Sequence, residues 1–329
     1  GLRSFETIGL RDNDETPMPL NSYQLQHRES DWFSQELRLA SPAEDSYDYL
    51  VGLYYYKATN KNDDQFARII SPSLDGRFDN PSTPEIDHYD QSGFSRAEIE
   101  NTNMAIFGNV NIHTSENVTL FAGFRFLREE IKGTVSGTRI DKNPLVGSLD
   151  DNNAPASSID VGPFSSDASD TASIGRAGVQ YQFADNTMVY ATYSTGFKGR
   201  GYSTGYFASA DRFGAEPVDP EKSKSAEFGI KSTLFDGRAR LNANLFRTEI
   251  NGYQLTFRDL TTLVNSLNSV EAVQTEGLEV DFDLAATENL TFNARVAFMD
   301  ATFLSYANSN NADLSGTTLP NAPEFKCIF

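Results

Sequence analysis

Residues 196–201 read GFKGRG and combine three glycines with two basic side chains, Lys198 and Arg200, at the end of an alternating segment. Such a combination binds phosphate when the glycines open a helix, because a helix N-terminus presents free backbone N–H groups. The spacing fits neither G-x-x-x-x-G-K-[ST] nor G-x-G-x-x-G, and residues 202–213 are rich in Gly, Ser and Tyr rather than in helix formers. We therefore interpret GFKGRG as a loop entered from a β-strand.

Carboxylates stand at alternate positions at Glu279, Asp281 and Asp283. On a β-strand, alternate residues lie about 7 Å apart, which is too far for the three side chains to chelate one ion together. The acidic segments 148–153 (SLDDNN) and 165–170 (SSDASD) lack the D-x-[DN]-x-[DN]-G pattern of a calcium loop. We interpret the three carboxylates as a solvated strand face and the two segments as disordered loops.

The remaining reactive residue types form no recognisable site. His27, His88 and His113 have no cysteine neighbours at zinc-binding spacing, and the single cysteine, Cys327, has no partner for an internal disulfide. The sequence contains neither G-x-S-x-G nor H-E-x-x-H. We predict no catalytic residue, no metal ion and no cofactor, and we expect that the chain is not an enzyme.

The charge and hydropathy of the chain limit its partners and its location. It carries 46 acidic and 27 basic residues, a net charge of -19, whereas nucleic-acid binding needs clustered Lys and Arg, so nucleic acid is not expected as a partner. It begins at Gly1 without a signal-peptide pattern and has no apolar run near the ~18 residues of a membrane helix. The mean hydropathy of -0.45 still fits a transmembrane barrel, whose strands alternate apolar and polar residues.

The alternation is clearest in residues 278–284 (LEVDFDL), where apolar and carboxylate side chains take opposite faces, as on a strand. The same alternation is found in residues 118–126, 177–183 and 290–298. In residues 238–245 the phase slips near Phe246, which we interpret as a bulge or an aromatic at the membrane rim, or as a misplaced strand. Two opposite faces are expected, an exposed outer face with Leu278, Val280, Phe282, Leu290, Phe292 and Val296 and a concave face with Glu279, Asp281, Asp283 and Arg295.

Ten strands follow from this pattern, at 33–41, 47–57, 100–112, 116–132, 171–184, 187–197, 223–235, 238–254, 270–286 and 289–304. Short turns alternate without exception with long segments rich in Gly, Ser, Asn and Asp. The long segments are 58–99, 133–170, 198–222, 255–269 and 305–319. Successive connections of an antiparallel meander lie at opposite ends, so the short turns 41–46, 113–116, 185–186, 236–237 and 287–288 are expected at one end.

This asymmetry favours an all-β fold, an antiparallel transmembrane β-barrel of the outer-membrane type, with short periplasmic turns and long outer loops. A soluble β-sandwich or propeller is the alternative. Several alternating stretches run for ten or more residues, near the ~9–11 that cross a bilayer at a tilt, whereas globular strands average about five or six. Aromatic residues near strand ends fit interfacial girdles and are Tyr54, Tyr55, Tyr56, Phe183, Tyr193, Phe197, Phe235 and Phe303.

Five segments of the chain share a further pattern. They are FSQELRLASP (33–42), YLVGLYYY (49–56), VYATYSTGFKGRGY (189–202), TEGLEVDF (275–282) and LPNAP (319–323). Together they resemble the barrel of TonB-dependent outer-membrane receptors. The resemblance implies a barrel of about 22 strands closed by an N-terminal plug. Residues 1–329 are expected to form one partial barrel domain without the plug, the TonB-contacting segment and the final strands, and such a half-barrel would leave two unpaired edges.

The resemblance implies TonB-energised uptake, across the bacterial outer membrane, of a scarce ligand such as a ferric siderophore, cobalamin or a glycan. The implied partners are that ligand, the TonB complex through the plug, and outer-membrane lipid and lipopolysaccharide. A passive diffusion porin, which needs no plug, is the alternative. A small complete barrel that ends at Phe329 is less favoured, because PEFKCIF has no full strand around it.

The segment 198–222 follows a strand that rises to the outer rim, where an imported ligand arrives first. Positive charge and aromatic faces suit anionic iron chelates and stacking groups. The candidate ligand-binding residues are Lys198, Arg200, Tyr202, Tyr206 and Arg212. The same side chains could instead pack the loop against its neighbouring strands or contact lipopolysaccharide phosphate, and the sequence leaves these alternatives open.

Overall fold

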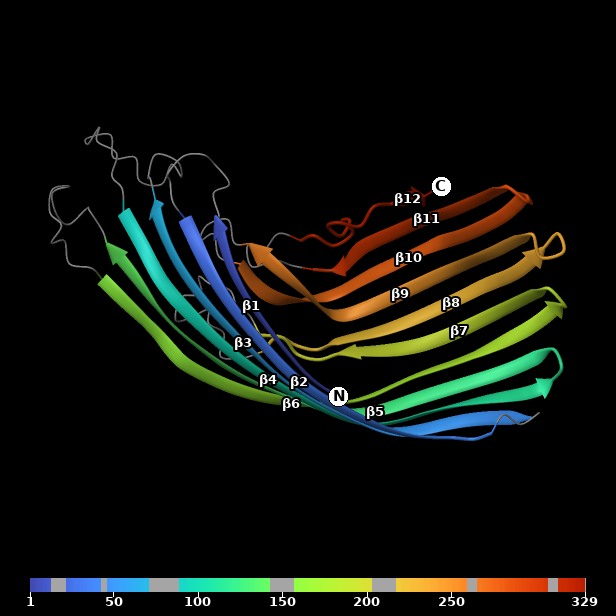
Figure 1. The fold of residues 1–329 in the computed structure, drawn as a ribbon, viewed down its shortest axis with the longest axis horizontal. Helices are drawn as coiled ribbons and strands as arrows, with labels where there is room; N and C mark the ends of the chain where they lie inside the picture. The colour runs from blue at the N-terminus through green and yellow to red at the C-terminus, as the bar shows by residue number, and fades with distance from the viewer. Residues whose placement is uncertain are drawn as a thin grey trace.

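A computed structural model of the chain describes residues 1–12, 22–42, 46–70, 89–142, 157–202, 217–258, 265–306 and 313–328. The described residues form one antiparallel sheet of twelve strands, in which each strand pairs with its neighbours in sequence (Figure 1). This confirms the predicted all-β meander. Among the residues described, no helix has the length and apolar character needed to cross a membrane.

The strands differ greatly in length. They are β1 (Leu2–Asp12), β2 (Ser22–Ala40), β3 (Tyr47–Ile70), β4 (Tyr89–Ser115), β5 (Val118–Lys142), β6 (Ser157–Ala184), β7 (Thr187–Lys198), β8 (Glu221–Leu234), β9 (Ala239–Arg258), β10 (Asn265–Thr287), β11 (Leu290–Ser305) and β12 (Phe325–Ile328). Strands β3 to β6 have 24 to 28 residues, more than twice what a bilayer requires. The sheet therefore extends well beyond the membrane on the side of the long connections.

The predicted short turns lie together at one end of the sheet. Figure 1 shows the β4–β5, β6–β7, β8–β9 and β10–β11 turns side by side. Four backbone hydrogen bonds tie this end together, and they run from His113 N to Ser46 O, Gln182 N to Asn117 O, Thr233 N to Asn186 O and Ala285 N to Arg238 O, at 2.7–2.9 Å. The topological prediction is confirmed, with the turn predicted at 113–116 moved to 116–117.

Exposed apolar side chains form cross-strand rows on one face of the sheet. The first row is Leu37, Leu53, Ile106 and Phe126 on β2 to β5. The second is Phe228, Leu245, Leu278, Phe298 and Phe325 on β8 to β12. All but Leu278 expose 49–68% of their surface. Such rows belong against lipid, because a soluble protein would bury them.

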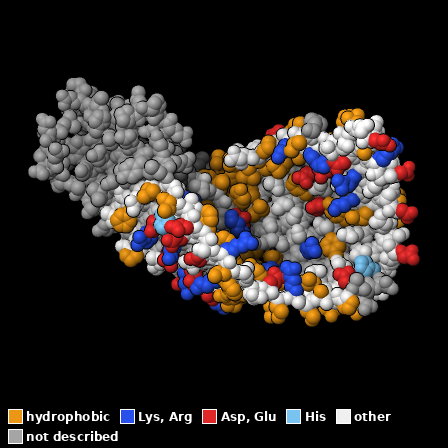
Figure 2. Space-filling view, viewed as in Figure 1, with side chains coloured by type: hydrophobic (Ala, Val, Ile, Leu, Met, Phe, Trp, Pro, Cys, Tyr) orange, Lys and Arg blue, Asp and Glu red, His pale blue; other side chains and the backbone are white. Residues whose placement is uncertain are grey.

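The opposite face is polar. Asp281 lies between Asn242 and Arg295, and Asp283 lies between Arg240 and Asn293. Figure 2 shows the molecule hollowed on one side, with Lys and Arg side chains in and around the hollow. Of the six side chains expected outward, Leu290 and Phe292 are exposed, and the other four are half-buried because neighbouring strands flank them. None is buried in a second layer, which excludes a sandwich for the described residues.

Three of the five long predicted loops, 58–99, 133–170 and 255–269, are strand wherever the structure describes them. Most of 58–99 belongs to β3 and β4, and the acidic segment 165–170, expected to be a disordered loop, lies within β6. The pattern failed here because both faces of the sheet are wet beyond the membrane, so apolar residues no longer alternate while the backbone ladder continues. Cross-strand ion pairs replace the apolar rows, as between Lys57 and Glu100 at 2.8 Å. The acidic segment 148–153 lies outside the described residues.

Two strands escaped prediction altogether. Strand β1 reads LRSFETIGLRD and pairs with β2 over its whole length. Strand β12, the four residues FKCI, pairs with β11. Both occupy edges of the sheet. Strand β1 carries polar or charged residues on both faces and β12 has only four residues, so the apolar–polar period that marks a membrane strand is weak in them.

Aromatic rings cover glycines on the polar face. Phe246 lies directly opposite Gly277, and a Cβ built on Gly277 would lie 3.0 Å from the ring. The pairing of β9 with β10 is continuous around Phe246, so the interpretation of this position as a bulge is wrong. The same arrangement places Phe107 over Gly52, Phe121 over Gly178 and Tyr190 over Gly229. The missing side chains make room for rings, which explains why the alternation slips there.

A small apolar cluster lies at the end of β9 to β11 that is opposite the short turns. Phe303 and Tyr306 stack at 5.3 Å between ring centres and pack with Val270, Val273, Ala301 and Leu319. The segment after β11 covers this cluster, and its Leu319 N–H donates to the Ala301 carbonyl at 2.8 Å. Phe303 is therefore a core residue, not the girdle aromatic that we expected.

Candidate functional site

The inner wall of the barrel opens where β6 and β7 separate. Their last backbone pair is Arg176 with Ser194, and β6 continues beyond it for nineteen residues alongside β5 only. At the point of separation the Thr195 hydroxyl accepts from the Gly175 N–H at 3.0 Å and replaces the ladder bond. Residues 157–175 of β6 therefore have one strand edge that β7 does not pair, and other parts of the chain can bind to this edge.

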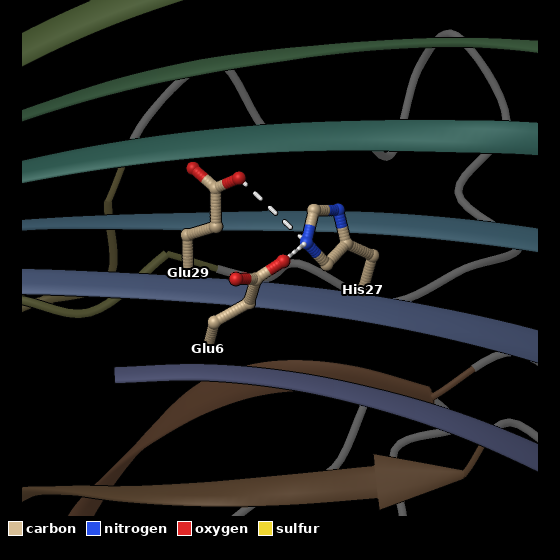
Figure 3. Close-up of side chains that lie close together, drawn as sticks. All are labelled: Glu6, His27 and Glu29. Carbon is tan, nitrogen blue, oxygen red and sulfur yellow. Dashed lines mark hydrogen bonds and ion pairs between the residues drawn. The ribbon is translucent and has the colours of Figure 1, made fainter. Parts of the chain in front are cut away.

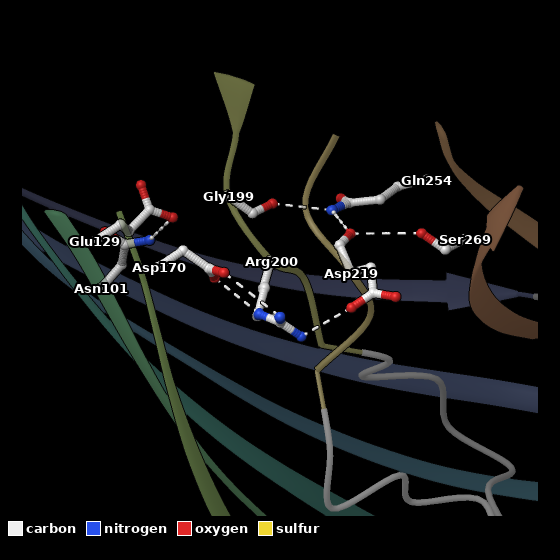
Figure 4. Close-up of polar contacts among 8 residues, drawn as sticks. All are labelled: Asn101, Glu129, Asp170, Gly199, Arg200, Asp219, Gln254 and Ser269. Atoms are coloured by element: carbon white, nitrogen blue, oxygen red, sulfur yellow. Dashed lines mark hydrogen bonds and ion pairs between the residues drawn. The ribbon is translucent and has the colours of Figure 1, made fainter. Parts of the chain in front are cut away.

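Two short segments, 199–202 and 217–220, fill this opening, and we call them the strap. They are joined by a bridge between Gly201 and Val218, whose N–H donates to the Gly201 carbonyl at 2.8 Å. The Gln254 side-chain amide donates to the carbonyls of Gly199 and Asp219, both at 2.9 Å (Figure 4). The strap is thus fixed to β9 through its own backbone carbonyls. These hydrogen bonds do not depend on which side chains the strap carries.

Arg200 fixes the strap to β6 on its other side. Its Nε and Nη2 donate to the two oxygens of Asp170 at 2.8 and 3.4 Å, and its Nη1 donates to Asp219 at 3.1 Å (Figure 4). Asp170 raises the pKa of the Arg200 guanidinium through the hydrogen bond, so the group stays charged. Arg200 and Asp170 expose 25% and 21% of their side chains, and the fork between them is therefore partly shielded from water.

Tyr202 is the most deeply buried of the three predicted residues that the structure describes. Its ring covers Gly133 on β5, where an added Cβ would lie 2.7 Å from Cζ. Its hydroxyl donates to the Ser166 carbonyl at 2.8 Å. That carbonyl belongs to the part of β6 that β7 does not pair, so Tyr202 caps an exposed strand edge.

Lys198 ends β7 and pairs with Glu221 at 2.6 Å, and 58% of its side chain stays exposed. The structure therefore brings Lys198, Arg200 and Tyr202 together at the opening. Tyr206 and Arg212 lie outside the described residues. Ligand contact by the five residues remains a prediction, and the contacts of Arg200 and Tyr202 with neighbouring strands are those that the alternative of loop packing expects.

Several polar residues of this site were not predicted. Glu129 accepts from Asn101 at 3.2 Å and from Asn103 at 3.0 Å, and it lies against the backbone of Gly199 (Figure 4). Asp170 falls in a segment that we interpreted as a loop. The useful signal was the spacing of Asp167 and Asp170, which stand three positions apart and therefore take opposite faces of a strand, as expected where both faces are wet.

Basic side chains rest on aromatic rings below the strap. Arg125 lies 4.8 Å from the ring centre of Tyr54, Arg176 lies 5.7 Å from that of Phe121, and Lys231 lies 5.7 Å from that of Tyr190. Each contact attracts the cation to the face of the ring by about 0.5–1 kcal/mol. The polar wall therefore carries several fixed positive charges in a chain with a net charge of -19.

The sequence matches the family of TonB dependent receptor-like β-barrels over residues 3–326, almost its whole length. The chain belongs to this family. It is thus part of a bacterial outer-membrane barrel of a non-enzymatic transporter family, which agrees with the apolar rows on one face and the polar wall on the other. The resemblance found in the sequence is confirmed.

Individual relatives are distant. The probable TonB-dependent siderophore receptor PiuA of Acinetobacter baumannii is 23% identical over 158 residues, which make up 45% of this chain and 21% of that protein. The crystal structure of PiuA superposes with a TM-score of 0.51 at 12% identity and covers 94% of this chain and 52% of its own. That of the ferric yersiniabactin uptake receptor FyuA from Yersinia pestis superposes with a TM-score of 0.67 at 17% identity. The match covers 99% of this chain and 42% of FyuA, so the chain spans less than half of that receptor.

Proposed function

We propose that the chain forms about half of the barrel wall of a receptor that imports a ferric siderophore across the outer membrane with energy from the TonB complex. Membership of the receptor family over residues 3–326 is the observation that carries the proposal. The siderophore is chosen over cobalamin or a glycan because PiuA is named as a siderophore receptor and FyuA as a ferric yersiniabactin uptake receptor. The plug and the TonB contact are proposed to lie in parts of the receptor outside these residues.

The fixed cations of the inner wall support an anionic ligand. Among the described residues, Arg125, Arg176 and Lys231 lie on aromatic rings and form no ion pair with a carboxylate, whereas Arg200 pairs with both Asp170 and Asp219, so their charge is less neutralised than that of Arg200. A ferric complex with acidic oxygen ligands gains attraction along such a wall. We propose that Lys198, Arg200, Tyr202, Tyr206 and Arg212 form the outer part of this path and meet the ligand first.

The outer face suits the proposed lipid partners. A shallow hollow of about 660 Å³ is lined by Leu37, Leu53, Ile106 and Phe126, with Arg128 beside them. Apolar side chains with a cation just above them match the acyl chains and phosphate of an outer-leaflet lipid or lipopolysaccharide. Arg128 also pairs with Glu130 at 2.8 Å, so a phosphate would compete with that carboxylate.

The decisive experiment is uptake of ⁵⁵Fe-labelled siderophores by iron-limited cells that carry the receptor containing this chain. We expect accumulation that disappears when TonB is deleted or the proton gradient is collapsed. A passive porin would instead admit the solute down its gradient with no change on TonB deletion, and it would conduct ions when placed in a planar bilayer. Energy-dependent uptake of cobalamin or a glycan without iron uptake would keep the receptor and refute the siderophore.

A further inference from the structure

A histidine and two glutamates converge on the outer face of the sheet, beyond the apolar rows. His27 and Glu29 are two residues apart on β2, and Glu6 lies directly opposite Glu29 on β1. His27 Nε2 lies 2.8 Å from one oxygen of Glu6 and 3.6 Å from one oxygen of Glu29 (Figure 3). The ligand atoms of all three residues lie within 4.8 Å of one another.

We propose that Glu6, His27 and Glu29 bind a divalent transition-metal ion such as Zn²⁺. One imidazole nitrogen with two carboxylate oxygens is a donor set for zinc and its neighbours, whereas Ca²⁺ prefers oxygen alone. Zinc ligands at about 2.0 Å in a tetrahedron lie about 3.3 Å apart. The two distances from Nε2 bracket this separation, so small side-chain rotations would place all three donors around one ion.

The backbone holds the three residues in place. Strands β1 and β2 pair without interruption from Leu2 with Phe33 to Asp12 with Tyr23, and β2 pairs in the same way with β3. The donors therefore stand on a continuous ladder and not on a loop, which lowers the cost of ordering them around an ion. All three side chains stay half-buried or exposed, so an ion can reach them.

The charges around the triad also favour a cation. Two carboxylates that share one ring nitrogen repel each other unless a positive charge lies between them. Among the described residues, Lys61 Nζ lies 3.7 Å from the second carboxylate oxygen of Glu29. Arg96 forms an ion pair with Asp63 at 2.8 Å. Glu6 has no ion-pair partner among these residues except His27. His27 and Glu29 line a hollow of about 270 Å³, which leaves room for a water as a fourth ligand.

The position separates this ion from the transported cargo. His27 and Glu29 lie on the same face of β2 as Leu37 and Leu39, which is the face assigned to lipid. Glu29 stands about 26 Å along the strand from Leu37. The ion would therefore lie outside the barrel wall, beyond the apolar rows, and would join the edge strand β1 to β2. The sequence predicted no metal here because Glu6 and His27 are 21 positions apart and β1 was not recognised.

The test is titration of the receptor that contains this chain, purified in detergent micelles, with Zn²⁺, followed by competition with a chromophoric chelator, and with Co²⁺, followed by its d–d absorption. We expect one ion per chain and at least a tenfold loss of affinity in both His27→Ala and Glu6→Gln. His113→Ala and His88→Ala are the matched controls and should bind as the parent chain does. Circular dichroism of each variant checks that the sheet is kept.

Hydrogen exchange supplies a second readout that does not depend on affinity. Zn²⁺ should slow exchange of β1 amides in the parent chain and leave His27→Ala unchanged. Equal Zn²⁺ affinity in the parent and in folded His27→Ala would overturn the proposal. So would the absence of binding by the folded parent chain, since His27 would then contact the two glutamates without a metal.

Discussion

Replacing Arg200 by Ala removes the fork that holds the strap to β6. The Asp170 half of the fork is bidentate and about three-quarters shielded, so it contributes roughly 1.4 kcal/mol, between an exposed ion pair and a buried one. The Asp219 half adds little, because that carboxylate is 73% exposed and water screens it. A loss of about 1.4 kcal/mol corresponds to a tenfold increase in the population of the released strap.

Hydrogen exchange measured by mass spectrometry reports that population directly. In Arg200→Ala, amides of residues 199–202 and 217–220 should exchange about tenfold faster, while those of β9 and β10 keep their protection. Arg96→Ala is the matched control, because Arg96 makes the same fork with Asp63 but exposes 67% of its side chain on the outer face. It should leave exchange of the strap unchanged.

The outcome also separates the two roles of Arg200. Faster exchange with unchanged binding of an anionic iron chelate would assign Arg200 to loop packing, and weaker binding at unchanged exchange would assign it to the ligand. Unchanged exchange of the strap in a folded Arg200→Ala chain would refute the reasoning that this fork holds the strap in place.

Two further predictions concern the wall itself. Gly178→Ala should destabilise the barrel by about 1–3 kcal/mol, because the new Cβ would lie 2.4 Å from Phe121 Cζ and 2.5 Å from the Ala191 carbonyl oxygen. Gly9→Ala is the control and should leave stability unchanged, because its Cβ would meet nothing within 4 Å. Equal urea unfolding midpoints of the two variants would contradict this prediction. Burial raises the pKa of the Asp64 carboxyl, whose Oδ1 has no hydrogen-bond partner, although Arg28 acts in the opposite direction. The folded state then binds the proton more tightly, so the parent loses stability as the pH rises through the folded-state pKa. Asp64→Asn should gain about 1 kcal/mol at pH 7 and lose this advantage below the ordinary aspartate pKa, and a gain that is the same at every pH would contradict the burial argument.

The sequence predicted those parts of the fold that lie in the membrane. The period of LEVDFDL and its relatives arises because one face meets lipid and the other water, and ten strands and all short turns followed from it. Beyond the membrane both faces meet water, so the extension of β3 to β6 and the whole of β1 carried no such period. Strand pairing continues there through backbone bonds and ion pairs, which a hydropathy pattern does not record.

The candidate sites show the same limit. Lys198, Arg200 and Tyr202 were found because charge and aromatic character gather within five residues. Their partners Asp170, Glu129 and Gln254 come from three other strands, and only the register of the sheet brings them to the strap. The triad at His27 depends on the same kind of information, since one of its members stands on a strand that the sequence did not reveal.

The assignment of faces is tested most directly by fluorescence quenching in membranes that contain brominated lipids. Cys327 is the single cysteine, so Cys327→Ser provides a background in which one fluorophore at a time is attached to a new cysteine in the receptor. Labels at Phe126 and Phe298 should be quenched strongly. Labels at Asn103 on β4 and Asn244 on β9, which face the polar side of the sheet, should not. Strong quenching at Asn103 and Asn244 with none at Phe126 and Phe298 would contradict the account.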